Sequence, residues 1–428
     1  MKEIISLHLG GAGVQLGNSI WELISLEHNI NETGKLAFPS NNNNFTNFYS
    51  EINNEVYSPR ALFIDTDPVS INNLTRSQYS RLYNPDMLIS SKEDSGGVFC
   101  KIMCDYVKID LYMEKLRILA EACDNLQGFS LYFATGGGSG SGISSMILER
   151  INSEYENKNI ISFPIYPSPE VPKGTLDYYN SAFVTDFLIK YSNSVIVLDN
   201  KALYSICKNE LQISAPTFTQ LNNVASLTIN SITSNFRFPN THFSSLHDIS
   251  QLLSQNNRNF LTTSFTPISN IDFSDISIEN LTDLALSERY SNVGFYKGQS
   301  KSYACSITYR GDVDINEIQK TIKTCYDKKI IDFVNESYNK LSYGINSDKP
   351  KVFDDMEIFP MDRSVCVMNN SQKIKGLFNK IEKIVTFLYS KRAFVYHYCS
   401  SGMEEGEFSE SVERLVYLRE LYEDTKEN

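Results

Sequence analysis

Short apolar runs alternate with amphipathic stretches through the first half of the chain. The runs that fit buried strands cover residues 4–9, 61–65, 129–133, 160–165 and 194–198. Between them, apolar residues recur at helical spacing, for example over residues 14–27, 112–122 and 142–156. Strands that alternate with helices predict an α/β fold, in which helices cover both faces of a parallel sheet.

The second half of the chain is less regular. Helical patterns are expected over residues 219–236 and around 315–335, and strand patterns cover 303–309 and 364–368. Two amphipathic helical patterns follow at residues 371–390 and 409–422. Because 428 residues exceed what one hydrophobic core usually supports, we expect two or three domains. The changes of pattern place the boundaries so that three result, over residues 1–200, 201–370 and 371–428.

Composition and charge narrow the class of protein. With 39 basic and 51 acidic residues the net charge is −12, which disfavours nucleic acid and favours basic partners. Apolar runs stay below the roughly 18 residues that span a bilayer, and the charged start of the chain does not fit a signal peptide. The eight cysteines lack paired C-x-x-C sets, which predicts free thiols rather than zinc ligands or disulfides. We therefore expect a cytoplasmic protein with no membrane partner.

The most informative motif is the glycine-rich run A-T-G-G-G-S-G-S-G over residues 134–142. It follows a predicted strand and precedes a predicted helix, a position that argues against a flexible linker. Glycines leave backbone N–H groups exposed, and the helix start adds the positive end of its dipole, so the run predicts a phosphate-binding loop. We expect Gly137, Gly138, Ser139 and Gly140 to contact the phosphate.

A second glycine cluster, which includes Gly10, Gly11 and Ala12, follows the first predicted strand. The pattern G-x-G-x-x-x-G from Gly11 to Gly17 is one residue longer than the dinucleotide fingerprint, so an NAD(P)-dependent enzyme is an alternative. Against it, residues 28–34 do not end a strand with an acidic residue. A single nucleotide between two glycine loops fits better, and the lack of a G-K-[ST] motif excludes the P-loop class.

Acidic residues follow the second predicted strand and recur in the next loop. Asp65 and Asp67 end that strand, and Glu93 and Asp94 lie in the loop. Carboxylates beside a phosphate repel it unless a cation intervenes, so the sequence predicts Mg²⁺, with Asp67 as its ligand. A solvated acidic turn is the alternative for both Asp67 and Asp94.

Three further residues fit a purine base. Asn200 follows another predicted strand and offers both a donor and an acceptor, and Asn222 does the same within the long helix. Phe218 lies on that helix face, where its ring can stack on the base. An ordinary turn residue is the alternative for Asn200.

Read together, these motifs resemble the tubulin family, and specifically its alpha subunits. The matching stretches follow one another along the whole chain: A-G-V-Q-L-G-N from Ala12, the run 136–142, I-Y-P from Ile165, Y-N-S from Tyr179, Y-R-G-D-V from Tyr309, K-R-A-F from Lys391 and G-M-E-E-G-E-F-S-E from Gly402. Two features favour alpha over beta. Residues 347–362 match a long loop that alpha subunits carry, and Asp248 stands where alpha has Glu and beta has Lys.

The resemblance implies a tubulin-like fold: a GTP-binding domain, a central helix with a catalytic loop and an intermediate domain, and an outer layer of C-terminal helices. It implies GTP and Mg²⁺ as ligands, with Lys173 and Asp177 as further nucleotide-binding residues. It also implies a heterodimer with beta-tubulin that polymerises head to tail into microtubules of the cytoskeleton. Motor and microtubule-associated proteins are further partners, which the acidic C-terminal helix face would suit.

The resemblance gives Asp248 the catalytic role. In alpha subunits the buried GTP is not hydrolysed, and the acidic loop residue completes the GTPase site of the neighbouring beta subunit. Asp248 would position or deprotonate the attacking water there, a role worth roughly 10²–10⁴ in rate. The alternative is that Asp248 only caps the helix that runs to Leu253.

The chain departs from the family pattern near the nucleotide and in the catalytic loop. Near the nucleotide, Gly11 and Gly97 replace the usual Gln and Asn, Lys173 replaces a hydroxyl residue, and Phe218 replaces Tyr. In the catalytic loop, Phe243 and Ser245 replace Asn and Asp. Three further positions have Asp in place of the usual Glu: Asp67, Asp177 and Asp248. The altered catalytic loop, with Phe243 and Ser245, favours a second hypothesis, a specialised tubulin-like structural protein that co-assembles without efficient hydrolysis. The sequence ends six residues after Tyr422, so we do not expect the family's glutamate-rich tail or its modifications.

Overall fold

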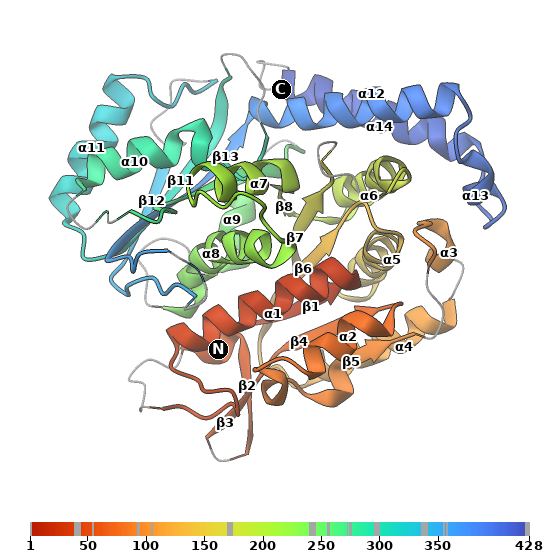
Figure 1. Ribbon diagram of the computed structural model, residues 1–428, viewed down its shortest axis with the longest axis horizontal. Helices are drawn as coiled ribbons and strands as arrows, with labels where there is room; N and C mark the ends of the chain where they lie inside the picture. The colour runs from red at the N-terminus through yellow and green to blue at the C-terminus, as the bar shows by residue number, and fades with distance from the viewer. Residues whose placement is uncertain are drawn as a thin grey trace.

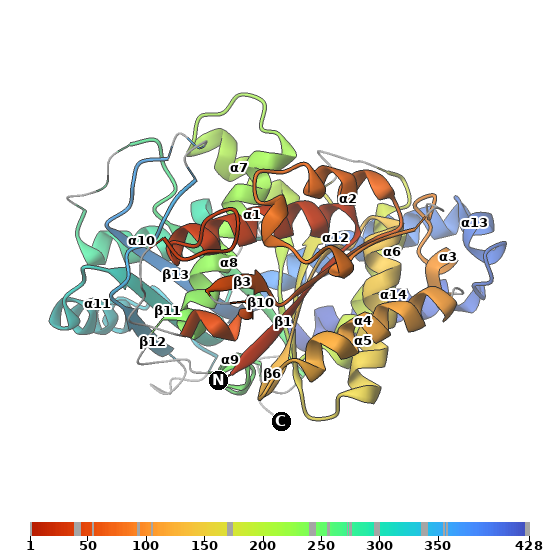
Figure 2. The ribbon, with the colours of Figure 1, turned by 90° about the horizontal axis from the view of Figure 1, so that it is seen from below.

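The structure is a computed structural model of the chain. It describes residues 2–37, 44–53, 55–91, 95–103, 106–168, 174–238, 245–254, 257–271, 273, 276–294, 300–334, 341–353, 356 and 358–423. Within these residues a long sheet crosses the molecule, and helices lie on both of its faces (Figures 1 and 2).

The N-terminal half of the sheet is parallel throughout. Its strands are β1 (Glu3–Leu9), β4 (Ala61–Asp65), β5 (Leu88–Ser90), β6 (Leu126–Ala134), β7 (Asn159–Tyr166), β8 (Ser194–Ile196) and β9 (Leu198–Asp199). They lie in the order β8-β7-β6-β1-β4-β5, and β9 pairs with β7. The predicted strands are confirmed, except that the last one is split in two at Val197. The carboxyl ends of parallel strands meet at one edge, which is where ligands bind in α/β folds.

Helices connect these strands and form two layers. In the first half they are α1 (Gly10–Glu27), α2 (Pro68–Thr75), α3 (Cys100–Met103), α4 (Tyr106–Glu121), α5 (Gly138–Glu154), α6 (Asp177–Tyr191) and α7 (Asn200–Asn209). Apolar side chains of α1, α2 and α7 belong to one buried cluster, and those of α4, α5 and α6 belong to a second cluster. The chain therefore forms the predicted α/β architecture.

The central helix α8 (Phe218–Arg237) packs along α1 and leads into the second half of the sheet. The elements that follow are α9 (Leu246–Leu253), β10 (Phe260–Thr266), α10 (Ile278–Leu286), β11 (Ser302–Gly311), α11 (Ile315–Asp327), β12 (Leu341–Asn346) and β13 (Arg363–Ser371). β10 pairs parallel with β8 and antiparallel with β13, so one 11-stranded sheet continues through both halves of the described chain.

The C-terminal helices form an outer layer (Figure 1). They are α12 (Lys375–Ser390), α13 (Val395–Cys399) and α14 (Gly406–Glu423), and α12 and α14 pack on each other and on α6. A separate hairpin of β2 (Tyr49–Asn53) and β3 (Val56–Pro59) lies near the N-terminus. No helix among the described residues has the length and apolar character needed to cross a membrane. No disulfide joins the cysteines that the structure describes.

Several helix ends differ from the sequence prediction. α1 and α5 begin earlier than predicted, at Gly10 and Gly138, because glycines that we assigned to loops form the first helical turn of each. α11 ends at Asp327 rather than near residue 335, and Lys329 has a φ of 51°, which a helix cannot accommodate.

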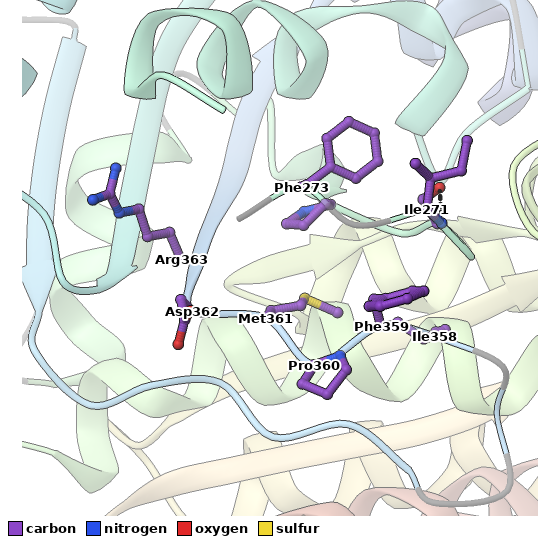
Figure 3. Close-up of a pocket in the computed structure, with 10 residues that line it drawn as sticks. Ile271, Phe273, Ile358, Phe359, Pro360, Met361, Asp362 and Arg363 are labelled. Carbon is purple, nitrogen blue, oxygen red and sulfur yellow. Dashed lines mark hydrogen bonds between the residues drawn. The ribbon is translucent and has the colours of Figure 1, made fainter. Parts of the chain in front are cut away.

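Residues 347–362, the segment that resembles the long alpha loop, alternate between buried and exposed side chains where they are described. The side chains of Phe353, Met356, Ile358 and Met361 are buried. Together with Ile271, its last residues line a cavity of about 20 Å³ (Figure 3). That volume holds about one water molecule, so this cavity is too small for a nucleotide.

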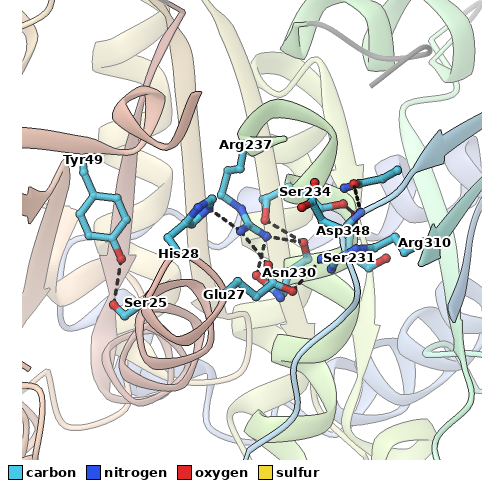
Figure 4. A network of polar contacts seen from close by, with 12 residues as sticks. Ser25, Glu27, His28, Tyr49, Asn230, Ser231, Ser234, Arg237, Arg310 and Asp348 are labelled. Carbon is cyan, nitrogen blue, oxygen red and sulfur yellow. Dashed lines mark hydrogen bonds and ion pairs between the residues drawn. The ribbon is translucent and has the colours of Figure 1, made fainter. Parts of the chain in front are cut away.

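A buried ionic cluster ties α1, α8 and β11 together (Figure 4). The Glu27 carboxylate accepts hydrogen bonds from Arg237 and Arg310, each at 2.8 Å, and the three side chains are at most 1% exposed. Burial alone would raise the pKa of Glu27, yet the two guanidinium groups lower it to about 2. His28 accepts a further bond from Arg237 at 3.0 Å, and burial lowers its pKa to about 3, so His28 is neutral.

Candidate nucleotide-binding site

A cavity of about 330 Å³ opens at the carboxyl edge of the parallel strands, a size typical of small-ligand sites. Its walls come from the ends of β1, β4, β6 and β7 and from the starts of the helices that follow them. The predicted site residues that line it are Gly10, Gly11, Ala12, Asp67, Gly137, Gly138, Ser139, Gly140, Asp177, Asn200, Phe218 and Asn222. The structure thus brings together residues that lie up to 212 positions apart in the sequence.

The two glycine loops pack backbone against backbone at the floor of the cavity. Gly10 has a φ of +71°, and a Cβ there would lie 2.7 Å from Cα of Gly140. A Cβ on Gly138 would lie 2.5 Å from the carbonyl carbon of Gly97. In the described chain, α1 and α5 start here without a side-chain cap or an acidic residue in the first turn. Among the described residues, no acidic side chain of these first turns therefore compensates the positive ends of the two helix dipoles, and an anion such as a phosphate group can bind there.

Hydroxyl groups gather around the start of α5. The Ser139 hydroxyl is hydrogen-bonded to the hydroxyl of Thr66 and, at 3.1 Å, to that of Ser95. Ser95 in turn accepts from the backbone N–H of Gly97 at 3.3 Å. Because a hydroxyl can donate or accept, this group can adapt its donors to a bound phosphate.

Two carboxylates lie at the end of β4. Asp65 is 2% exposed and accepts a hydrogen bond from Ser70, and burial raises the pKa of Asp65 above its ordinary value. Asp67 is the N-cap of α2 and accepts from the backbone N–H of Val69 at 2.9 Å. Both carboxylates line the cavity, so oxygen ligands of the kind that Mg²⁺ prefers stand beside the phosphate cradle.

The far wall carries the predicted purine contacts. Phe218 and Asn222 lie one turn apart at the start of α8, where Thr217 forms a capping box. Asn200 starts α7 directly after Asp199, whose carboxylate caps that helix. Two amides and a partly exposed ring therefore meet in one wall, which suits the edge and the face of a purine.

Asp177 lies on the side wall, in the first turn of α6. Its carboxylate accepts from the backbone N–H of Gly174 at 3.0 Å. Of the other predicted ligands, Asp94 and Lys173 lie outside the described residues, and so does Phe243 of the predicted catalytic loop.

Asp248 lies far from this cavity. It is the third residue of α9 rather than its N-cap, which is Ser245, and the two form a capping box in which Asp248 accepts from the Ser245 N–H at 2.9 Å. On the same helix, Ser250 is hydrogen-bonded to Asn159 at the start of β7. The cavity lies at the other end of this 8-residue strand, which spans roughly 25 Å. Asp248 therefore cannot reach the cavity of its own chain.

Sequence reasoning missed several polar residues of the cavity wall. Gln15 lies one turn after Gly11 on α1, so helical spacing was a usable signal for it. Ser70 lies in the first turn of α2, just after its cap Asp67, and carried the same signal. Ser95 lies in the loop after β5, where no local pattern indicates its position.

Comparison with known families indicates which ligand this cavity binds. Residues 3–208 match the GTPase domain of the Tubulin/FtsZ family, and residues 257–383 match the tubulin C-terminal domain. The first match contains both glycine loops and both carboxylates, and it favours a mononucleotide over the dinucleotide alternative. The two matches together cover most of the chain. The chain therefore belongs to the Tubulin/FtsZ family and is a tubulin-like GTP-binding protein.

Proposed function

We propose that this chain is an alpha-type tubulin subunit that pairs with beta-tubulin and polymerises head to tail into microtubules. The observation that carries the proposal is the position of the GTP cavity and of Asp248 at opposite edges of one sheet. In a head-to-tail contact, one edge of a subunit meets the opposite edge of the next, so an acidic side chain and a cavity face each other only across an interface.

Two features support the alpha type over the beta type. An acidic residue, Asp248, occupies the position where beta subunits carry Lys. Residues 347–362 match the longer loop of alpha subunits, and Phe353, Met356, Ile358 and Met361 anchor this segment to the core. An alpha subunit keeps its own GTP and supplies the acidic residue to its neighbour.

Asp248→Asn tests the role of Asp248 in trans. Asparagine can still accept from the Ser245 N–H, so α9 stays capped while the negative charge is lost. We expect phosphate release per polymerised subunit to fall by roughly 10²–10⁴, with the GTP content of the heterodimer unchanged. Asp314→Asn, which changes the exposed N-cap of α11 in the same way, is the control and should hydrolyse at the wild-type rate. Unchanged release with Asp248→Asn refutes the role.

A second candidate function is a structural subunit that co-assembles without efficient hydrolysis. One carboxylate oxygen of Asp248 is engaged by the Ser245 N–H, and Ser245 itself caps the helix, so both residues have structural roles in α9. Such a subunit would polymerise with its beta partner and release little phosphate even as wild type. Phosphate release from the wild-type polymer separates the two functions.

Different residues of the cavity would contact different parts of GTP. The glycine turns would hold the phosphates, the wall of Asn200, Phe218 and Asn222 would hold the guanine, and the carboxylates that follow β4 would face Mg²⁺. We expect one non-exchanging GTP per heterodimer, measured by nucleotide analysis of the denatured complex. Motor and microtubule-associated proteins would dock on the acidic face of α14 in the cytoplasmic cytoskeleton. A well-folded heterodimer without guanine nucleotide refutes the whole proposal.

A further inference from the structure

Two loops at the glycine-rich floor of the cavity are held from behind by one buried side chain, Asn180 of α6. Its amide nitrogen donates to the Gly136 carbonyl at 2.6 Å and to the Gly97 carbonyl at 2.9 Å. Gly136 and Gly97 both line the cavity, whereas Asn180 is 0% exposed. One amide therefore joins the glycine run that leads into α5 to the loop that follows β5.

The two loops also pack directly on each other, so a shift of one displaces the other. A Cβ on Gly138 would lie 2.5 Å from the carbonyl carbon of Gly97 and 2.9 Å from Oγ of Ser95. Gly97 has a φ of +76°, which residues with a Cβ rarely adopt. The amide of Asn180 thus fixes two backbone segments that already touch.

The side chain of Tyr398 on α13 determines which way this amide points. Carbonyl oxygens only accept, so the Asn180 nitrogen must face Gly136 and Gly97, and its oxygen Oδ1 must face away from them. There Oδ1 accepts from the Tyr398 hydroxyl at 2.7 Å, and the same hydroxyl lies 3.5 Å from the Leu176 carbonyl. Both N–H groups and the oxygen of Asn180 are therefore hydrogen-bonded in a single orientation.

Tyr398 also connects α13 to the elements around the two loops. Its backbone carbonyl accepts from the Cys100 thiol at 3.4 Å, and Cys100 begins α3, shortly after Gly97. Its ring packs edge to face on Tyr179 and Phe183 of α6, with centroid distances of 5.7 and 5.5 Å. Both views of the molecule place α13 beside α3 (Figures 1 and 2). The outer layer of C-terminal helices thus reaches the floor of the cavity through Tyr398.

The Gly136 carbonyl controls the direction of an expected phosphate donor. This carbonyl and the Gly137 N–H belong to one planar trans peptide, so they point in opposite directions. Because Asn180 binds the carbonyl, the Gly137 N–H points away from Asn180. Gly137 lines the cavity as the N-cap of α5, a helix start without a side-chain cap. Rotation of this peptide would turn the N–H away from a phosphate bound there.

We infer that Asn180, oriented by the Tyr398 hydroxyl of α13, is a positioning residue that sets the peptide between Gly136 and Gly137 for phosphate binding and so governs how long GTP is retained. The inference rests on the proposed GTP site, and it gives an outer helix a part in nucleotide retention. Both side chains are fully buried, so they act through the backbone of the loops rather than by touching the nucleotide.

The test uses the full-length chain in its heterodimer. Excess GDP replaces the nucleotide that exchanges, and the GTP that remains per heterodimer is followed over time by nucleotide chromatography. Asn180→Ala removes the amide without adding a charge, and we expect it to shorten the half-life of retained GTP by roughly 10–100-fold. Tyr398→Phe keeps the ring and removes only the hydroxyl, and it should shorten the half-life by roughly 3–10-fold.

Two other tyrosines provide matched controls. Tyr422→Phe removes another fully buried hydroxyl of the C-terminal helices, which contacts the Phe260 backbone instead of Asn180. It should lower Tm as Tyr398→Phe does, but it should leave the half-life of retained GTP at the wild-type value. Tyr396→Phe, on α13 itself and 78% exposed, should change neither quantity. This contrast separates a positioning role from a general loss of stability.

Sedimentation of the same samples shows whether the heterodimer stays intact. Wild-type half-lives in both Asn180→Ala and Tyr398→Phe overturn the inference, and so does an equal shortening in Tyr422→Phe. Loss of GTP only in step with dissociation of the heterodimer also overturns it, because α13 would then act through the subunit interface. If Asn180→Ala does not fold, Tyr398→Phe decides. A wild-type heterodimer that holds no GTP overturns the proposed function instead.

Discussion

Replacing Glu27 with glutamine tests how much the buried ionic cluster contributes to stability. The Glu27 carboxylate accepts 2.8 Å hydrogen bonds from both Arg237 and Arg310, whose side chains are 0% and 1% exposed. Glutamine keeps the shape but loses the charge, so two buried guanidinium groups lose their counter-charge. We expect Glu27→Gln to lower the free energy of unfolding by about 3–5 kcal/mol.

The pKa of Glu27 supports this magnitude. A pKa of about 2 in place of the ordinary 4.5 means that the fold favours the charged carboxylate by about 3 kcal/mol. Domains are typically stable by only about 5–15 kcal/mol, so the loss is a large fraction of the total. The corresponding fall in Tm is roughly 10 °C for a domain of this size. His28 cannot replace the lost charge, because it is neutral and its partner is itself Arg237.

A matched substitution on the surface provides the control. Glu114 accepts two bonds from Arg117 on α4, at 3.0 and 2.8 Å, but these side chains are 51% and 55% exposed. An exposed pair of this kind contributes about 0–1 kcal/mol, so Glu114→Gln should barely change Tm. The assay is thermal unfolding followed by circular dichroism. If Glu27→Gln and Glu114→Gln melt together, the reasoning is refuted. If Glu27→Gln is insoluble, Glu27→Asp, which keeps the charge, should fold with an intermediate Tm.

Two further predictions concern pH and a buried hydroxyl. Burial lowers the pKa of both His8 and His28 from 6.5 to about 3, so between these values the unfolded chain binds protons that the folded chain excludes. The free energy of unfolding should therefore fall as pH drops below 6.5, by about 1.4 kcal/mol per pH unit for each histidine. Urea unfolding between pH 6.5 and about 5, above the ordinary pKa of 4.5 at which Glu27 begins to contribute as well, measures the slope, which His28→Gln should roughly halve; an unchanged slope contradicts the assignment. The buried Tyr422 hydroxyl accepts from the Phe260 N–H at 2.9 Å and donates to its carbonyl at 3.1 Å. Tyr422→Phe should cost about 1–3 kcal/mol in urea unfolding, whereas the half-exposed Tyr417→Phe on the same helix should cost nothing measurable, and equal costs would count against this pairing.

The parts of the site that sequence predicted share one physical reason. Gly137 to Gly140, Asn200 and Phe218 lie where a strand ends or a helix begins, and such positions are visible in local patterns of apolar and polar residues. Because parallel strands collect their carboxyl ends at one edge, a correct order of elements already brings these positions together. The α/β fold and the outline of the cavity followed from this alone.

The parts that sequence could not predict depend on contacts between distant segments. Glu27 pairs with residues 210 and 283 positions away, and nothing local marks it as a buried charge. The strand β10 is fully buried but rich in Thr and Ser, so its pattern is not that of a buried strand. The Thr263 hydroxyl of this strand accepts a hydrogen bond from the Asn292 side chain, and the Ser264 hydroxyl donates one to the Ala285 carbonyl. Polar residues become compatible with burial only through such partners.

The separation of the two edges of the sheet determines where each substitution can have an effect. Asp65 lies within the GTP cavity of its own chain, so its replacement should change metal retention before any polymer forms. Asp248 lies at the far end of β7, roughly 25 Å away, so its charge should matter only where a second subunit brings a cavity to it. If Asp248→Asn altered the GTP content of the unassembled heterodimer, it would be acting through the packing of α9 on the sheet. The proposed action in trans would then have no basis, because the same residue would already affect the nucleotide without a neighbour.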